Sequence, residues 1–529
     1  MQKQAFINGV IHTLDTAVPT SEAMYVEDGV IRRLVPSTQI SKLCSDIVDL
    51  EGHTVIPGFN DSHLHLLSYG GALIRMDLRS CAEPEDIIRA GCEKLEQEPA
   101  QVLWLVGFLS PYKFSRVLLD QISEQIPVFY SRVNGHTFSP GVSVLTKVCC
   151  NTAALKAAGL PEGDGLLCGS GAASVCSLLP ALTRQEKKEA IAVAASLLSA
   201  QGFTSVHSND MVDGDLELLE IVQELEQEGH LPLRLSMQCL FHSQKTLECF
   251  LDKDPRLDFD NDLHRIGAVK LILDGVLGDH TSALKQPYLD QPYTQGVLLF
   301  SPQELERIIE TAHLHNLQVV IHTIGNQAIQ VALNSLESVQ QRLGDRGLRH
   351  GLVHCLLLES QTMQQMKSQN IAALIQPIAA VSDYSILSAR LGPNLTSPAY
   401  GWKSMLKQGL LVAGGTDCPC ESPNPFLSLT AAITRQDSAG MPAGGFLPEE
   451  RLTLDEALRI MTVNGAYLDR EENRKGTLIP GKLADFIVLS QDIFSIAPED
   501  ISNTRCLSTI VGGDIVYQNK DSIDLVSLW

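Results

Sequence analysis

The sequence predicts an α/β protein in which a (β/α)8 barrel is combined with a small β domain built from both ends of the chain. Two observations lead to this fold class. The middle of the 529-residue chain alternates strand-like apolar runs with amphipathic helical patterns, whereas both ends consist of short runs of strand-forming residues separated by turn signals. A chain of this length can bury a large core without disulfides.

The two ends of the chain read as β structure. Residues 4–34 contain the apolar runs QAFINGVIHTLD and AMYVEDGVIRRLV, broken by Asn8-Gly9 and Asp28-Gly29, which are hairpin dipeptides. Residues 476–519 show the same pattern of short apolar runs separated by turn residues, with the glycine pair Gly512-Gly513 between two of the runs. We therefore expect residues 1–56 and 471–529 to form one composite domain and residues 57–470 to form the main domain.

The middle of the chain consists of repeated strand–helix units, which indicate a parallel sheet. Strand-like runs end in Gly, His or Asp and are followed by helical patterns, as in AVKLILDG before PQELERIIETAHLHN and QVVIHTIGN before QAIQVALNSLESVQQRL. The span 57–470 is long enough for eight such units. Residues 80–185 lack clean alternation and contain several helical patterns, so we expect an insertion subdomain there, between early barrel strands.

Composition excludes several classes of partner. Lys and Arg number 40 against 62 Asp and Glu, giving a formal charge of −22, which repels phosphate backbones and anionic lipid. No apolar run approaches the roughly 18 residues of a membrane-spanning helix, and the first residues do not resemble a signal peptide. The 13 cysteines form no CxxC pair, as expected for free thiols in a reducing compartment. We expect a cytoplasmic protein that binds neither nucleic acid nor membranes.

The strongest chemical signal is His63-x-His65, which closes a predicted strand in PGFNDSHLH. Residues i and i+2 of a strand face the same side, so both imidazoles can reach one metal ion. His313-Leu314-His315 has the same spacing but lies in a helical pattern, where i and i+2 point apart, so we expect it at the surface.

Four further residues support the interpretation of the His pair as part of an active site. Lys270 lies in the apolar run AVKLILDG, where an ammonium is costly unless it is paired, deprotonated or modified. His322, His354 and Asp417 each come at the C-terminal end of another apolar run. Barrel active sites form at the C-terminal ends of the strands, so the whole set is predicted to meet there.

These residues and their motifs resemble the amidohydrolase superfamily. The order HxH, Lys, His, His, Asp is similar to the superfamily pattern, and the phrases PGFNDSHLH, VKLILDG, IHTIGN, GTDCP and GKLADFIVL resemble its amidohydrolase-3 branch, which includes YtcJ-like proteins and N-substituted formamide deformylases. The resemblance covers essentially the whole chain, including both β ends. Its motifs are not specific for a substrate.

The resemblance implies a metal-dependent hydrolase on a TIM barrel with a composite β-sandwich. Carried over to this sequence, it implies one metal held by His63, His65 and Asp417, a second held by His322 and His354, and a bridging carbamate on Lys270. Zinc suits these ligands, with manganese, iron or cobalt as alternatives, and one or two ions per chain are compatible with the superfamily.

The resemblance also implies a mechanism for a small-molecule substrate. A divalent ion activates a water molecule that attacks an amide, formamide or cyclic amide carbon, and Asp417 serves as general base and passes the proton to the leaving amine. His136 in RVNGHTF matches a family position that contacts substrate, and a structural role is an equal alternative. Asn134 stands where the family usually has Asp, and a longer segment separates His136 from residues 151–155, and both departures put the substrate pocket in doubt. Asn326 also replaces a usual Asp, so any acid–base role at that position is lost.

Several alternatives stay open at the level of sequence. Asp274 either orients ligands or makes an Asp-Gly turn, with the turn slightly favoured, and Asp61 is expected to be a turn residue or a partner of a ligand rather than a ligand. Thiolate ligation by Cys355 or Cys418 is a minor alternative. The competing functions are a mononuclear deaminase of an amino-heterocycle, against which Lys270 argues, and a non-catalytic metal-binding or regulatory protein. A homodimer is expected only as the commonest assembly of soluble proteins.

Overall fold

The computed structural model describes residues 3–42, 44–75, 78, 81–98, 100–107, 111–132, 147–253, 263–519 and 527–528. The chain divides into two compact units. The first comprises Met1–Leu64, Ala195–Leu216 and Val222–Trp529, and the second comprises His65–Ala194 and Glu217–Ile221. Each unit is described by itself below.

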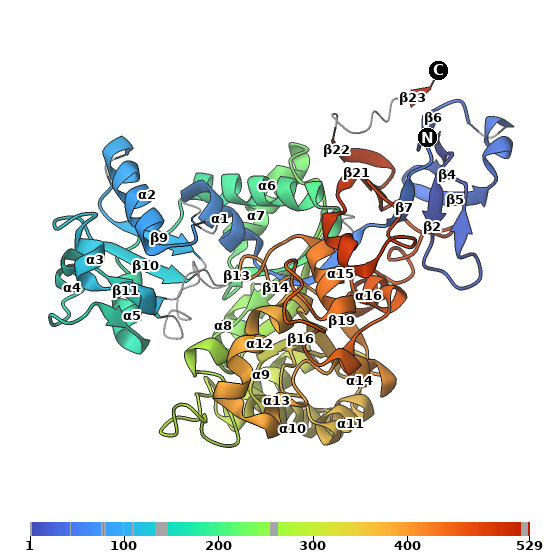
Figure 1. Ribbon diagram of the computed structural model, residues 1–529. Coiled ribbons are helices and arrows are strands. Elements are labelled where there is room, and N and C mark those ends of the chain that lie inside the picture. Colours follow the sequence, from blue (N-terminus) through green and yellow to red (C-terminus); the bar gives the residue numbers. More distant parts are fainter. Residues whose placement is uncertain are drawn as a thin grey trace. The chain divides into compact units, whose positions relative to one another are not determined.

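The first unit contains a nearly closed barrel of eight parallel strands (Figure 1). In barrel order they are β8 (Phe59–Leu64), β13 (Phe203–Val212), β14 (Arg234–Leu240), β15 (His264–Ile272), β16 (Val319–Thr323), β17 (Gly351–His354), β18 (Ala372–Ile375) and β19 (Val412–Gly414). Neighbouring strands pair in parallel register, and the outer strands β19 and β8 approach each other. The predicted fold class is therefore confirmed.

Helices follow the barrel strands as the apolar periodicity predicted. Helix α9 is a clear case, because Pro302 occupies its first turn and Ser301 and Glu304 form a reciprocal capping box that satisfies otherwise unpaired N–H groups. No helix in the described ranges combines the length and apolarity needed to cross a membrane. The helices that follow β13 to β19 are α7 (Leu216–Gln227), α8 (Gln244–Leu251), α9 (Pro302–Leu314), α10 (Asn326–Leu343), α11 (Ser360–Ser368), α12 (Pro377–Leu391), α13 (Pro393–Thr396), α14 (Trp402–Lys407), α15 (Pro425–Thr434), α16 (Leu454–Ile460) and α17 (Val463–Leu468).

The prediction that the second HxH pair lies at the surface is wrong for one of its two histidines. His315 is exposed, but His313 is fully buried, and its Nε2 lies 2.9 Å from the carbonyl oxygen of Gly344. The two positions do point apart, as helix geometry requires. His313 follows Leu305 by eight residues and therefore shares the apolar face of α9.

Both ends of the chain contribute to two mixed sheets in the first unit. The five-stranded sheet has the order β23, β6, β1, β4, β5, and the six-stranded sheet has the order β22, β21, β20, β7, β2, β3. Their bounds are β1 (Lys3–Ile7), β2 (Val10–His12), β3 (Thr20–Ser21), β4 (Ala23–Glu27), β5 (Val30–Val35), β6 (Ile47–Asp49), β7 (Thr54–Pro57), β20 (Phe486–Leu489), β21 (Cys506–Val511), β22 (Asp514–Gln518) and β23 (Ser527–Leu528).

A shared core holds these two sheets together. Phe6 and Met24 of the five-stranded sheet pack in one buried cluster with Val55 and Phe486 of the six-stranded sheet. β7 pairs with β20, so the N-terminal and C-terminal segments form one sheet, as the composite β-sandwich predicted. The β4–β5 hairpin turns at Asp28-Gly29, where both residues have positive φ, the conformation that made this dipeptide a hairpin signal.

The second unit contains a four-stranded mixed sheet, which the sequence did not reveal. The order of the sheet is β12, β11, β10, β9. The helices and strands of the second unit are α1 (Leu66–Arg75), α2 (Pro84–Gln97), β9 (Leu103–Gly107), α3 (Arg116–Asp120), β10 (Val128–Arg132), β11 (Val148–Cys150), α4 (Thr152–Ala157), β12 (Leu166–Leu167), α5 (Gly169–Cys176) and the part of α6 (Arg184–Ala200) up to Ala194. Leu103 and Leu105 of β9 join one apolar cluster, and Trp104 and Val106 join another. Both faces of the sheet are covered, so its strands show no polar alternation.

Candidate metal centre

The seam between the last and first barrel strands brings two predicted ligands together. The amide N–H of Asp417 donates to the carbonyl oxygen of His63 at 2.8 Å, so the loop after β19 is tied to the end of β8. Gly415 allows this approach, because a Cβ there would lie 2.7 Å from the amide nitrogen of His63. The close packing of backbone at this seam therefore fixes the distance between His63 and Asp417.

Asp61 completes the seam as an internal hydrogen-bond acceptor. Its carboxylate accepts the N–H of His63 at 3.0 Å, the N–H of Thr416 at 3.1 Å and the hydroxyl of Thr416 at 2.6 Å. Burial raises the pKa of Asp61 to about 7, while these hydrogen bonds act in the opposite direction. Asp61 thus supports the segments that carry two predicted ligands, which agrees with its expected role as a partner.

Three of the predicted ligands converge within the first unit. His63, His354 and Asp417 each offer one nitrogen or oxygen atom, and these atoms all lie within 4.8 Å of one another. Nε2 of His63 lies 3.3 Å from Oδ1 of Asp417. His354 and Asp417 both adopt left-handed backbone conformations, with φ of 74° and 57°, a conformation that is costly for residues with a Cβ and is held here by the surrounding strand ends.

His322 joins this group through His354. Its Nδ1 lies 2.9 Å from Nε2 of His354, and its Nε2 lies 3.3 Å from the carbonyl oxygen of Gly275. Burial, followed by the neighbouring His322, lowers the pKa of His354 well below its usual value. His354 is therefore neutral at physiological pH, which is the form of imidazole that binds a metal ion.

Lys270 is fully buried on β15, the fourth strand of the barrel. Its Nζ has no hydrogen-bond partner among the residues that the structure describes. Burial lowers the pKa of Lys270 to about 7, and the charge of Asp417 acts in the opposite direction. A substantial fraction of this amine is therefore neutral near pH 7, so it is available to react or to accept a modification.

Two buried amide side chains that the sequence analysis did not single out contact these histidines. Nδ2 of Asn209 lies 2.8 Å from Nδ1 of His63, and Oε1 of Gln376 lies 2.7 Å from Nδ1 of His354. Their partners are 146 and 22 residues away along the chain. Gln376 directly follows the apolar run of β18, so the sequence held a signal for it, whereas Asn209 lies within β13 among polar residues and has no such signal.

The slightly favoured reading of Asp274 as an Asp-Gly turn is wrong. Its fully buried carboxylate accepts the backbone N–H groups of Ala283, Ile324 and Gly325 at 2.8–3.0 Å. Asp274 therefore ties the end of β15 and the segment that follows it to the end of β16. Oδ1 of Asp274 also lies 3.6 Å from Nε2 of His322.

The remaining predicted residues fall into three groups. His65 is buried and is the first residue of the second unit, so its ligand role stays a prediction. His136 and Asn134 lie outside the described residues. Cys355 and Cys418 are buried next to predicted ligands, but neither belongs to the ligand group formed by the described residues. Burial raises the pKa of the Cys355 thiol, which disfavours its thiolate.

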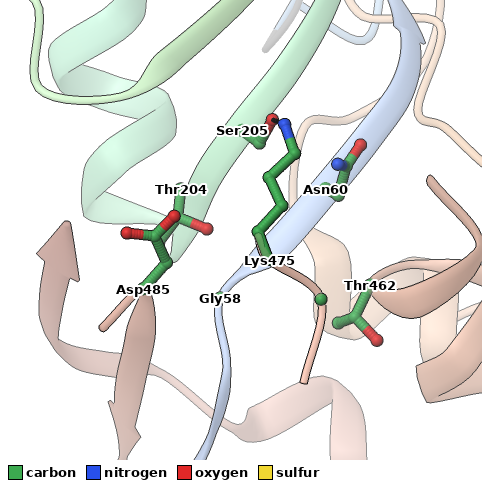
Figure 2. Close-up of a pocket in the computed structure, with 8 residues that line it drawn as sticks. Gly58, Asn60, Thr204, Ser205, Thr462, Lys475 and Asp485 are labelled. Atoms are coloured by element: carbon green, nitrogen blue, oxygen red, sulfur yellow. Dashed lines mark hydrogen bonds between the residues drawn. The ribbon is translucent and has the colours of Figure 1, made fainter. Parts of the chain in front are cut away.

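A small pocket is lined by residues from the starts of barrel strands and from the C-terminal part of the chain (Figure 2). It is lined by the starts of β8 and β13, including Asn60 and Ser205, and by Lys475, whose Nζ donates to the hydroxyl of Ser205 at 2.8 Å. Its volume of about 10 Å³ admits the centre of one water molecule. The pocket lies at the N-terminal ends of the strands, where barrels place stabilising rather than catalytic residues.

The whole chain is similar to known proteins. A sequence model described as "Amidohydrolase family" matches residues 46–517. The chain belongs to the amidohydrolase family. YtcJ of Bacillus subtilis (strain 168) is 29% identical over 550 residues, which cover 98% of this chain and 100% of that protein. N-substituted formamide deformylase of Arthrobacter pascens is 25% identical over 569 residues, which cover 99% of each chain.

A solved structure agrees with this assignment. An uncharacterized metal-dependent hydrolase from Pyrococcus horikoshii OT3 superimposes with a TM-score of 0.77 at 25% identity, covering 94% of this chain and 99% of that chain. The resemblance inferred from the sequence motifs is confirmed. The protein is a metal-dependent hydrolase of the amidohydrolase superfamily, whose members act on small molecules.

Proposed function

We propose that this amidohydrolase cleaves a carbon–nitrogen bond, in an amide, formamide or cyclic amide, with a metal centre at the C-terminal ends of the barrel strands. The observation that carries the proposal is the convergence of His63, His354 and Asp417, three potential ligand atoms within 4.8 Å. They come from separated parts of the chain and meet where barrel active sites form.

The donor set fits a divalent transition metal. Imidazole nitrogens and a carboxylate oxygen are ligands that zinc prefers, and manganese, iron and cobalt accept them as well. His65 and His322 would complete the set for one or two ions. When bound, such an ion supplies Lewis acidity that activates water and polarises the scissile carbonyl.

Lys270 fits the role of a modified ligand. Its partly neutral, fully buried amine can attack carbon dioxide, forming an N–C bond and releasing one proton, so that an anionic carbamate replaces an ammonium. This change removes the cost of a buried, unpaired cation and provides oxygen donors beside His322 and Asp417. The neighbouring strands β15 and β16 support this, because Ile272 pairs with His322 two residues beyond Lys270.

Asp417 is proposed as the group that moves the proton. Its carboxylate lies 3.3 Å from Nε2 of His63 and is only partly exposed, so it borders the site without being sealed from substrate. A carboxylate in this place can accept a proton from the attacking water and deliver it to the leaving nitrogen. The similarity to N-substituted formamide deformylase supports N-substituted formamides as the first substrate class to examine.

The test is turnover of N-substituted formamides, measured as formate release, before and after chelation and metal replacement. We expect turnover to disappear with chelator and to return with zinc or manganese. Asp417→Asn should retain the fold and lose at least 100-fold in kcat, within the range of general acid–base catalysis of about 100–10,000-fold. Asp492→Asn, which alters a carboxylate outside the barrel, is the matched control.

Other outcomes discriminate between the candidate functions. Full activity in Asp417→Asn would show that another group is the base. Ammonia release from amino-heterocycles without formate release would favour the deaminase, and metal binding without turnover on any amide would favour the non-catalytic protein. A hydrolase acting on a different amide would release a carboxylic acid from that compound in a metal-dependent manner.

A further inference from the structure

We propose that Asn209 and Gln376 are positioning residues, each of which holds Nδ1 of one metal-binding histidine through a buried side-chain amide. The inference rests on the proposed function, because it treats His63 and His354 as ligands. It goes further by assigning the groups that fix the direction of each ring. The two amides occupy equivalent places, since Asn209 lies on β13 beside β8 and Gln376 follows β18 beside β17.

The orientation of the Asn209 amide follows from its second contact. Nδ2 lies 2.8 Å from Nδ1 of His63 and 3.0 Å from the backbone carbonyl oxygen of Leu64. A carbonyl oxygen can only accept a hydrogen bond, so the group that faces it must be the NH2 and not the oxygen of the amide. The second hydrogen of the same NH2 then points at Nδ1 of His63.

This arrangement fixes the His63 ring at two points. Nδ1 accepts from Asn209, so in the neutral ring the proton resides on Nε2, which lies 3.3 Å from Oδ1 of Asp417. Asn209 is fully buried and contacts the backbone of the strand that carries His63. Rotation of the ring would therefore break a buried hydrogen bond and leave an amide donor unsatisfied.

Gln376 contacts His354 through the oxygen of its amide, whereas Asn209 contacts His63 through its NH2. Its Oε1 lies 2.7 Å from Nδ1 of His354, whereas its Nε2 lies 3.4 Å from the carbonyl oxygen of Leu374. The amide oxygen can only accept, so the ring carries its proton on Nδ1. Nε2 of His354 is left with its lone pair, which faces Nδ1 of His322 at 2.9 Å, and this is the state of the imidazole that binds a metal ion.

The two contacts bear on the affinity of the site for a metal ion. Ligand histidines commonly use the second ring nitrogen in a hydrogen bond that fixes tautomer and direction, and loss of that bond typically costs 10–100-fold in metal affinity. The Gln376 contact pre-orients His354 in its binding form. Nε2 of His63 can bind a metal ion only after its proton has moved to Nδ1, where it would meet the NH2 of Asn209. The Asn209 contact therefore fixes the ring of the metal-free protein and works against the tautomer that binds metal.

The test compares two variants with two matched controls. Asn209→Ala and Gln376→Ala remove the positioning amides. Asn60→Ala and Gln369→Ala remove amides that are equally buried in the first unit and have no hydrogen-bond partner within the described ranges. Zinc and cobalt affinities are measured by competition with a chromogenic chelator, and thermal unfolding of the metal-free proteins reports changes in the fold.

We expect about 10–100-fold weaker metal binding in Gln376→Ala and wild-type affinity in both controls. Asn209→Ala should bind metal no more weakly than the wild type but should lower the thermal stability of the metal-free protein, because it removes a buried donor from His63 and Leu64. Gln376→Glu retains an acceptor and should recover most of the affinity, as a merely structural role would not predict. Wild-type affinity in Gln376→Ala, or wild-type stability of the metal-free protein in Asn209→Ala, would overturn the inference for that residue. A wild-type protein that binds no metal would instead overturn the proposed function.

A second measurement stays decisive if a variant does not fold. Imidazole 15N shifts of the metal-free wild-type protein, labelled at histidine and assigned with single histidine variants, report which ring nitrogen carries the proton. We expect the proton on Nε2 of His63 and on Nδ1 of His354. The same tautomer at both positions would contradict the two amide orientations and the proposal with them.

Discussion

Replacing Asp274 with alanine should open the backbone around the site at three identifiable amides. The carboxylate of Asp274 accepts the N–H groups of Ala283, Ile324 and Gly325, and the side chain is fully buried. Asp274→Ala leaves these three donors without their acceptor in the protein interior. The end of β16 and the segment after β15 would then be joined by fewer contacts directly beside His322.

The expected loss of stability follows from the number of N–H donors that lose their acceptor. A buried donor left unsatisfied costs about 1–3 kcal/mol, so three donors give an upper range of about 3–9 kcal/mol, and entry of water brings the expected loss to about 3–5 kcal/mol. At the lower bound, a loss of about 3 kcal/mol corresponds to a roughly 100-fold change in an opening equilibrium.

Hydrogen exchange followed by mass spectrometry measures this equilibrium locally. Peptides that contain residues 283, 324 and 325 should lose roughly 100-fold in protection in Asp274→Ala. Asp290→Ala is the matched control, because Asp290 lies in the same segment but is a partly exposed partner of Arg390, whose contribution should be about 0–1 kcal/mol. Unchanged protection at the three amides in Asp274→Ala would refute the structural role of this carboxylate.

Three further predictions concern the buried charges of the first unit. Lys270→Met should lower the metal content per chain and abolish any stimulation by bicarbonate, and unchanged metal content would rule out the bridging role. Arg234→Met should cost about 3–5 kcal/mol in urea unfolding, because the buried carboxylate of Asp485 loses the guanidinium that now lies 2.7 and 2.9 Å away. Burial raises the pKa of Asp469, but the charges around it outweigh burial and hold that pKa well below its usual range, so its contribution to stability is present above about pH 4 and is lost as the pH falls. The urea midpoint should therefore fall from pH 5 to pH 3 more steeply in the wild type than in Asp469→Asn, and equal slopes would contradict this assignment.

Much of the fold could be predicted because local patterns report it. Strand–helix alternation indicated the parallel barrel, and Asp28-Gly29 marked a hairpin that the structure contains. The sheet of the second unit was missed because both of its faces are buried, so β9 carries no alternation that separates it from a buried helix. His313 was misplaced although its spacing from Leu305 already put it on the apolar face of α9.

Some residues of the candidate site could likewise be predicted from the sequence, and others could not. His63 could be named from its HxH spacing at the end of a predicted strand, and His354 and Asp417 because each ends an apolar run, since the strand ends of a barrel meet on one face. The groups that hold them could not be named in this way. Asn209 contacts His63, which is 146 positions away, and this pairing depends on three-dimensional proximity alone. Asp274 was considered as a residue that orients ligands, but its backbone partners, up to 51 positions away, could not be foreseen for the same reason.

The content of transition metal per chain tests the central claim most directly. Elemental mass spectrometry of protein purified without chelator should find at least one equivalent in the wild type, and about two if Lys270 bridges a pair. His354→Ala and Asp417→Ala should each lose metal, whereas His313→Ala, which removes a buried histidine of helix α9, should retain it. A wild-type protein that contains no metal and takes up none from zinc or manganese with bicarbonate would contradict the assignment of this cluster as a hydrolytic metal centre.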